Sequence, residues 1–361
     1  MAQDSSNSFL VLFFEPIRVF LEDDNVSEIL INGPDQIYVE RKGRLAKTEA
    51  RFVSEPALRA AATNVAKSVN RLLNDEQPRL DARLPDGSRV HAVIPPLSVK
   101  GTVVAIRKFR KEALTLEQLV HFESLDQTGV ALIDVAVKLH KNIMVSGATS
   151  SGKTSVLNVL SSCIGPTDRI LVIEDASELQ LMQDHVVSFE TRKPDAKGKG
   201  EVTIRDLVHS SLRLRPDRLV IGEIRGGEAL DLLQALNTGH AGSMSTIHAN
   251  SPLDCLSRLE TCALLSGIEI PLSALRSQVA SAIDMVVHTA RLSDGSRKIT
   301  EIAEVMPLTD GQYVTHPLYR YTMDHVDAEG RIVGKHEAIG RPSFLDQARI
   351  EGLPLDPSLF P

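Results

Sequence analysis

Residues 147–154 constrain the fold of this chain more than any other stretch of its sequence. Their letters, GATSSGKT, fit the phosphate-loop pattern of glycine, four residues and then Gly-Lys-Thr. The short apolar run 142–146 precedes them as a buried parallel strand would, and residues 155–160 continue as the first turns of a helix. Because strand, glycine turn and helix follow one another, the segment predicts a polyphosphate site in an α/β domain rather than a glycine-rich turn that binds nothing.

Each residue type in this loop has a chemical task at such a site. Successive backbone N–H groups and the helix N-terminus create a positive nest for phosphates. The Lys153 ammonium can reach the β and γ phosphates, and the Thr154 hydroxyl can ligate Mg²⁺. We therefore predict ATP and Mg²⁺ as ligands. The residues expected to hold the nucleotide are Gly147, Ala148, Thr149, Ser150, Ser151, Gly152, Lys153, Thr154 and Ser155.

Length and composition bound what else the chain contains. At 361 residues it is long enough for two domains, and 42% hydrophobic residues supply their cores. The formal net charge of −7 argues against a general nucleic-acid binder. The three cysteines lack metal-type spacing and suit a reducing cytoplasm. No apolar run approaches the ~20 residues of a spanning helix, so we expect a cytoplasmic protein that reaches a membrane through partners.

Residues 1–109 predict a small α+β domain. The apolar segment 9–21 predicts a terminal helix that packs on its own domain or on a neighbouring subunit, with docking to a membrane protein as the alternative. A helix is expected over 55–73. Strands are expected at 26–33, 36–40, 89–94 and 102–106. A polar linker over 110–118 would lead into an ATPase domain over 119–361, which ends in a helical and strand extension.

The far end of the first domain is rich in arginine, notably Arg83, Arg89 and Arg107. In one interpretation these side chains are solvated or paired with the nearby Asp81 and Asp86. In the other, they form a basic face that supplies arginine to a phosphate. These residues alone do not decide between the two.

Two predicted strands beyond the phosphate loop end in carboxylates, the first at Glu174 and Glu178, the second at Glu223. A carboxylate at a strand end beside such a loop can hold Mg²⁺ through water or polarise an attacking water. We assign the water to Glu223, which follows an apolar strand closely. Glu174 and Glu178 would then serve metal and water positioning, and an alternative role for Asp175 is to cap the following turn.

Two histidines, His240 and His248, flank a predicted strand at 243–247. A zinc site is not expected, since no third ligand has suitable spacing. A neutral imidazole that senses the γ-phosphate fits this position better, although a histidine outside such a context would have a structural role.

Together these segments resemble the secretion ATPases of the type II/type IV secretion and type IV pilus superfamily. Within it, the chain most resembles the tight-adherence pilus ATPases of the TadA/CpaF kind. Besides the phosphate loop, the matching segments are VSEI at 26–29, DARLPDGSR at 81–89, IRKF at 106–109, IEDASEL at 173–179, RLRPDRLVIGEIR at 213–225 and NTGHAGSMSTIHAN at 237–250.

The resemblance implies a fold, an assembly and an activity. The fold would be a RecA-like P-loop NTPase domain preceded by a small α+β, PAS-like domain, and six subunits would form a ring. The activity would be that of an ATP-hydrolysing motor for pilus assembly or secretion. Such a motor works at the inner membrane through a platform protein, which makes it a peripheral protein there.

The resemblance also implies roles for single residues. The phosphate loop resembles the Walker A loop of the family, and Glu223 resembles its atypical Walker B carboxylate. The aspartate box is matched by Glu174, Asp175 and Glu178, and the histidine box by His240 and His248. Related ATPases place arginines that reach the nucleotide at the positions of Arg83, Arg89 and Arg107. Which of the three does so stays open.

The chain departs from the family pattern in two informative ways. Ala148 and Ser150 stand where the family often has glycine, which bears on the loop dihedrals. The four-cysteine zinc module of the type II secretion branch is absent, which disfavours that branch. The conjugation or type IV secretion branch shares every catalytic motif and is the close alternative. A ring that binds ATP but acts as a scaffold or switch is an alternative of another class, opposed by the presence of Lys153 and Glu223.

Overall fold

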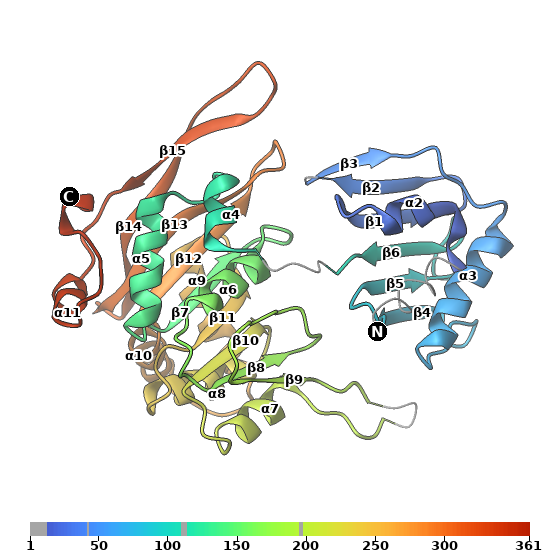
Figure 1. The fold of residues 1–361 in the computed structure, drawn as a ribbon. Coiled ribbons are helices and arrows are strands. Elements are labelled where there is room, and N and C mark those ends of the chain that lie inside the picture. Colours follow the sequence, from blue (N-terminus) through green and yellow to red (C-terminus); the bar gives the residue numbers. More distant parts are fainter. Residues whose placement is uncertain (1–12, 42, 110–113, 195–197) are drawn as a thin grey trace. The chain divides into compact units, whose positions relative to one another are not determined.

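The computed structural model describes residues 13–41, 43–109, 114–194 and 198–361. The chain forms two compact units, residues 1–112 and 113–361 (Figure 1). Part of the predicted linker, residues 110–113, lies outside the described residues. Its last three positions already belong to helix α4 (Leu116–His121), which begins there because Thr115 and Gln118 form a capping box. None of the helices among the described residues is long and apolar enough to cross a membrane.

The first unit is an antiparallel sheet of six strands in the order β3-β2-β1-β6-β5-β4. Its strands are β1 (Val26–Asn32), β2 (Ile37–Arg41), β3 (Arg44–Lys47), β4 (Arg79–Arg83), β5 (Arg89–Val93) and β6 (Val103–Arg107). Successive side chains of a strand point to opposite faces. Along β6, Val104 and Ile106 are buried, and they share a core with Leu58 and Val65 of helix α3 (Glu55–Ser68). The helix therefore covers one face of this sheet (Figure 1).

Two details of this unit, the end of α3 and two additional strands, differ from the predictions. Helix α3 ends at Ser68 rather than at residue 73, because Asn70 adopts φ +55° and Arg71 donates its N–H back to Ala66 O at 2.8 Å. Strands β3 and β4 were not predicted. The described part of the apolar segment, η1 (Glu15–Ile17) and α2 (Arg18–Glu22), packs into this unit's own core through Ile17. Residues 9–12 of that segment lie outside the described residues.

The second unit is built on a sheet of nine strands in the order β15-β14-β13-β12-β7-β11-β10-β8-β9. The strands from β12 to β9 in this order run parallel, and β13, β14 and β15 extend the sheet with antiparallel neighbours. Their bounds are β7 (Ile143–Gly147), β8 (Ile170–Glu174), β9 (Val186–Glu190), β10 (Arg218–Ile224), β11 (Met244–His248), β12 (Met285–Arg291), β13 (Arg297–Thr309), β14 (Gln312–Val326) and β15 (Ile332–Ala338).

Helices cover both faces of the parallel part of this sheet. Val145 and Val172 belong to one core, with helices α5 and α6, whereas Met144 and Ile173 belong to the other, with α8, α9 and α10. The strands are apolar on both faces because both are covered, which is typical of a doubly wound α/β unit. The remaining bounds are α5 (Gln127–Lys138), α6 (Lys153–Ser162), α7 (Ile204–Ser211), α8 (Glu228–Asn237), α9 (Pro252–Leu264), α10 (Leu272–Ala282), α11 (Leu345–Ile350) and η2 (Pro357–Leu359).

Parallel strands end at the same edge of a sheet, and this edge carries the predicted site. His248, the last residue of β11, pairs in register with Gly147, the last residue of β7. Glu174 ends β8, next to β10, which carries Glu223. We call this the carboxyl edge of the sheet and the opposite one the amino edge. Ligands of open α/β sheets bind outside the carboxyl ends of the strands.

Candidate nucleotide-binding site

The phosphate loop joins β7 to α6 in a backbone conformation that only a few residue types adopt easily. Gly147, Ser150 and Gly152 have φ of +157°, +60° and +100°. A side chain at Gly147 would collide with the carbonyl oxygen of Thr289, so glycine is required there. Ser150 carries a side chain in the left-handed region, at a cost of about 1–2 kcal/mol. Of the two departures from the family pattern, Ser150 is therefore the one that bears on the backbone.

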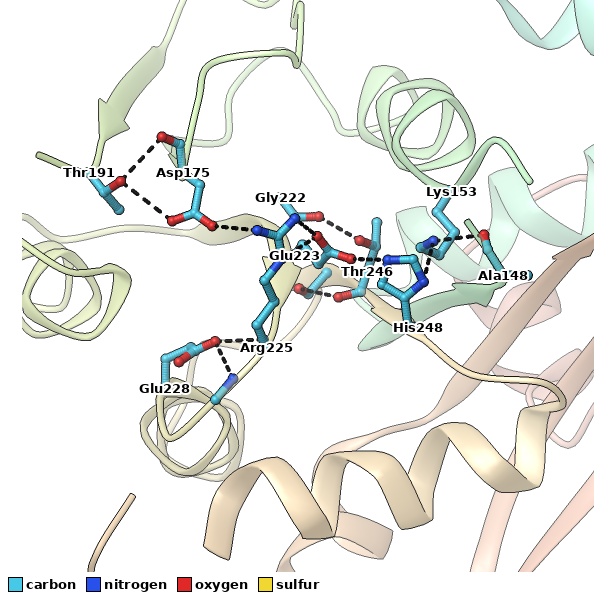
Figure 2. Close-up of polar contacts among 12 residues, drawn as sticks. Ala148, Lys153, Asp175, Thr191, Gly222, Glu223, Arg225, Glu228, Thr246 and His248 are labelled. Carbon is cyan, nitrogen blue, oxygen red and sulfur yellow. Dashed lines mark hydrogen bonds and ion pairs between the residues drawn. The ribbon is translucent and has the colours of Figure 1, made fainter. Parts of the chain in front are cut away.

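Lys153 is the first residue of α6 and points back over the loop (Figure 2). The residue is only 8% exposed. Its Nζ donates to Ala148 O at 3.0 Å and lies 3.3 Å from His248 Nδ1. A buried ammonium in contact with a carbonyl and an imidazole lies close to groups that an anionic phosphate could replace.

His248 connects this lysine to Glu223. Its Nε2 lies 2.8 Å from Glu223 Oε1 (Figure 2). Burial, and then the neighbouring Lys153 ammonium, lower the pKa of His248. The imidazole is then neutral at neutral pH, and the two contacts assign its tautomer: Nδ1 accepts from Lys153 and Nε2–H donates to Glu223. The carboxylate and the phosphate-loop lysine are thus joined through one ring.

Arg225 donates a hydrogen bond to the second carboxylate oxygen of Glu223. No role is predicted for this arginine from the sequence. Its Nε donates to Glu223 Oε2 at 2.6 Å, and its Nη1 donates to Asp175 Oδ2 at 3.2 Å. The available signal was its position two residues after Glu223 at the end of β10, since side chains two apart along a strand share a face. Asp175, Arg225, Glu223, His248 and Lys153 therefore form one continuous polar chain (Figure 2).

The turn after β8 is capped by Glu174 and not by Asp175, the residue considered for that role. Glu174 is 4% exposed, and its Oε1 accepts the backbone N–H groups of Glu178 at 3.0 Å and Leu179 at 3.1 Å. Glu174 is capable of this because its longer side chain folds back beside Gly222, where a Cβ would lie 3.0 Å from its Cγ. The shorter Asp175 side chain pairs with Arg225 instead.

The structure separates the two predicted histidines. His240 lies before β11, at the amino edge, with its Nδ1 3.2 Å from Ala235 O and its own carbonyl accepting from Ser243 Oγ at 2.8 Å. Strand β11 therefore lies between His240 and the phosphate loop. Of the two, only His248 lies at the phosphate loop of its own subunit, so the role predicted for His240 at the nucleotide finds no contact there within one chain.

The three predicted arginines form one row across the first unit's sheet. Arg83 pairs in register with Arg89, and Arg89 pairs with Arg107. Directly paired residues of neighbouring strands point to the same face, so these side chains share one face of the sheet. The Arg83 guanidinium also lies 6.0 Å from the centre of the Phe109 ring. The row ends at Glu28, the register partner of Arg107 on β1.

The phosphate loop fits a nucleotide phosphate by its own features. Ser151 Oγ is buried and has no hydrogen-bond partner among the residues that the structure describes, which is costly unless a ligand or water satisfies it. Half-buried Thr154, the second residue of α6, is placed for a metal ion at the phosphates. In the part of the chain that the structure describes, no three His, Cys, Asp or Glu side chains gather into a metal site.

Comparison with known proteins identifies the family to which this sequence is similar. The family model described as Type II/IV secretion system protein matches residues 14–330. A putative conjugal transfer protein of Mycobacterium tuberculosis is 37% identical over 293 residues, covering 80% of this chain and 83% of its own length. The type IV secretion system protein PtlH of Bordetella pertussis is 35% identical over 312 residues, covering 79% and 91% of the two chains.

Comparison with a solved structure supports the assignment of the fold. The ATPase DotB of Yersinia pseudotuberculosis matches with a TM-score of 0.58 at 17% identity, covering 83% of this chain and 79% of that one. At this identity the likeness concerns the fold alone. The predicted fold class, an N-terminal domain followed by a RecA-like domain, is confirmed.

Proposed function

The chain belongs to the family of Type II/IV secretion system proteins, and from this premise we propose that it is an ATP-hydrolysing motor. The superfamily predicted from the motifs is thereby confirmed. One observation carries the proposal: His248 joins the phosphate-loop lysine to the carboxylate of Glu223, 3.3 Å on one side and 2.8 Å on the other. A cation for the phosphates and a carboxylate that can position water are two groups that hydrolysis of a phosphoanhydride uses, and here they lie on either side of one imidazole.

In the proposed mechanism the loop first binds the triphosphate. The loop amides and the α6 N-terminus would hold the β and γ phosphates, and the Lys153 ammonium would exchange Ala148 O for phosphate oxygens. Ser151 Oγ would gain the partner that it lacks. When bound, Mg²⁺ supplies positive charge to the β and γ phosphate oxygens, and Thr154 would hold it, with Glu174 and Glu223 acting through water.

Glu223 would then position the attacking water. The water oxygen bonds to the γ phosphorus, the bond from that phosphorus to the β–γ bridging oxygen breaks, and the Glu223 carboxylate accepts the proton. Contacts from His248 and Arg225 fix the direction of this carboxylate before ATP arrives. A fixed base needs no reorganisation during the reaction, which lowers the barrier.

The first unit would supply the remaining cation. We assign to the row of Arg83, Arg89 and Arg107 the neutralisation of transition-state charge on the γ phosphate. The domain assignment stays as proposed from the sequence: 1–109, a linker over 110–118, and the ATPase domain over 119–361. Six such chains would form a ring that acts on an inner-membrane platform protein, with no zinc and no specific nucleic acid as partner.

The names of the relatives favour one branch of the family. Of the two relatives described above, one is named for conjugal transfer and the other for type IV secretion. Neither is named as a tight-adherence pilus protein. We therefore place the conjugation or type IV secretion branch first. The tight-adherence pilus branch remains a proposal that depends on the motif resemblance. Identifying the membrane protein that co-purifies with the tagged chain would separate the two, since one branch requires a conjugation channel and the other a pilus platform.

The experiment that tests the activity is a phosphate-release assay on the purified full-length chain with ATP and Mg²⁺. Turnover that requires both, and that disappears when Lys153 is replaced, supports a motor. Tight nucleotide binding without turnover, in protein whose oligomeric state is established by light scattering, would instead support the scaffold or switch.

A further inference from the structure

Two side chains of the β12–β13 hairpin donate hydrogen bonds to backbone carbonyls of the phosphate loop. Thr289 Oγ1, on β12, lies 3.1 Å from Ser151 O. Arg297, the first residue of β13, donates from Nε to Ser150 O at 2.9 Å. We infer that Arg297 is a positioning residue for nucleotide binding, one that holds the phosphate loop in its binding conformation. The inference rests on the proposed function, since it assumes that this loop binds nucleotide.

The contact falls on the one loop residue that needs support. Ser150 has φ +60°, a region that a side chain disfavours and that glycine enters freely. Its carbonyl direction is coupled to the direction of the next N–H, because both belong to one planar peptide. A bond from Arg297 to Ser150 O therefore also orients the Ser151 N–H, which donates to Ala148 O at 3.3 Å and closes the turn of the phosphate loop.

Arg297 is well anchored for this task. Its backbone carbonyl accepts from Ser124 Oγ at 2.6 Å, and it pairs in register with Arg291 on β12. The turn between these strands is itself fixed, because Asp294 accepts from Ser296 N and from Ile332 N of β15, both at 2.9 Å. Because the backbone of Arg297 is anchored, only the rotamers of its side chain have to be ordered for the bond to Ser150 O.

The left-handed backbone conformation of Ser150 allows the role of Arg297 to be tested by mutation. If the arginine offsets the cost of a left-handed serine, it should matter less when that cost is removed. Replacing Ser150 by glycine removes the Cβ without changing the Arg297 side chain. A double-mutant cycle between the two positions then measures their coupling.

The experiment measures the Kd of a fluorescent ADP analogue for the full-length chain by titration. We expect Arg297→Gln to weaken binding about tenfold, as loss of a charge-assisted hydrogen bond does. In the Ser150→Gly background the same substitution should weaken binding less than about threefold. Arg291→Gln is the matched control, since it removes the same charge from the other end of the same turn and should leave Kd within about twofold.

Each other outcome overturns the inference. Equal losses in both backgrounds would mean that Arg297 does not act through Ser150. An equal loss in Arg291→Gln would mean that the local positive charge, rather than the bond to the loop, matters. If Arg297→Gln does not fold, as judged by thermal unfolding, Arg297→Lys keeps the charge but lacks Nε, and its loss should again shrink in the Ser150→Gly background. A wild-type chain that binds no ADP would instead refute the proposed function, which distinguishes the two failures.

Discussion

Both the amino edge and the carboxyl edge of the parallel sheet carry polar side chains, but these are buried at the amino edge and partly exposed at the carboxyl edge. At the amino edge, Arg218 is 1% exposed and has three partners: Asp168 Oδ2 at 2.7 Å, Gly242 O at 3.2 Å and Val137 O at 3.2 Å. At the carboxyl edge, the side chains of Arg225 and His248 are 58% and 44% exposed. A buried group with all its partners stabilises the fold, whereas an exposed chain of contacts can be rearranged by a ligand.

Gly242 shows how closely the amino edge is packed. A side chain there would collide with the Arg218 guanidinium, and its N–H donates to Asn142 Oδ1 at 2.8 Å. Asn142 in turn donates from Nδ2 to Ala282 O at 2.7 Å. The glycine between the two histidines of the sequence motif is thus required by packing at the amino edge. One contiguous motif serves stability at its beginning and the candidate site at its end.

The largest expected effect tests the carboxyl edge. Lys153→Ala removes the loop's buried ammonium, so ATP affinity should fall severely and turnover should become undetectable. Thermal unfolding without nucleotide should change little in comparison. A titration with a fluorescent nucleotide and a phosphate-release assay provide the measurements. Wild-type affinity and activity in this variant would refute the proposed role of the loop.

The matching change at the amino edge should affect stability and leave binding intact. Arg218→Met deletes a buried guanidinium and leaves two carbonyls and Asp168 without it, at a cost of about 3–5 kcal/mol in the free energy of unfolding. Urea denaturation measures that loss. Below the transition, the nucleotide Kd should stay within about twofold of wild type, a difference of under ~0.4 kcal/mol. If Kd rose as steeply as stability fell, the two edges would not be separable.

Contiguous patterns could be predicted from the sequence, and contacts between distant segments could not. The phosphate loop is predictable because its glycines, lysine and flanking elements are consecutive. Arg297 lies 147 positions from Ser150, so only the folded sheet brings them together. His240 and His248 are close in sequence, yet a strand carries the chain from one edge to the other between them. Strands β3 and β4 escaped prediction because both are short edge strands rich in charge. Strand β3 has no alternating apolar pattern, and β4 has only Leu80 and Ala82 as apolar residues.

Glu223→Gln should separate binding from chemistry within the carboxyl edge. The amide keeps the shape of the side chain but cannot accept the proton of water, so kcat should fall at least ~100-fold. Binding of ATP with Mg²⁺ should persist, because Lys153 and the loop amides remain. Single-turnover hydrolysis measures the chemical step. Near-normal rates would transfer the role to Glu174 or Glu178.

The arginine row tests whether the carboxyl edge is complete within the second unit. Arginine fingers contribute ~10³–10⁵ in rate, so at least one of Arg83→Ala, Arg89→Ala and Arg107→Ala should lower kcat tenfold or more. Nucleotide affinity should change little, because the phosphate loop is intact. Light scattering must show the same oligomer for each variant. Wild-type rates in all three would leave the first unit without a part in the chemistry.

The smallest expected effect is the most direct test of the two edges, because it compares two histidines of one motif. His248→Ala removes the ring between Lys153 and Glu223. The hydrogen bond that orients the Glu223 carboxylate contributes roughly 1 kcal/mol, so its loss should lower kcat about fivefold. His240→Ala removes a side chain whose Nδ1 lies beside Ala235 O at the amino edge, and kcat should stay within about twofold.

Both histidine variants are assayed under the same conditions, with oligomeric state and thermal unfolding measured in parallel. A loss in His248→Ala alone would assign the site to the carboxyl edge of each chain. An equal loss in His240→Ala, in protein of unchanged stability, would contradict the separation of the edges. Because His240 is remote from the phosphate loop of its own subunit, such a loss would then have to arise at the site of another subunit in the assembly.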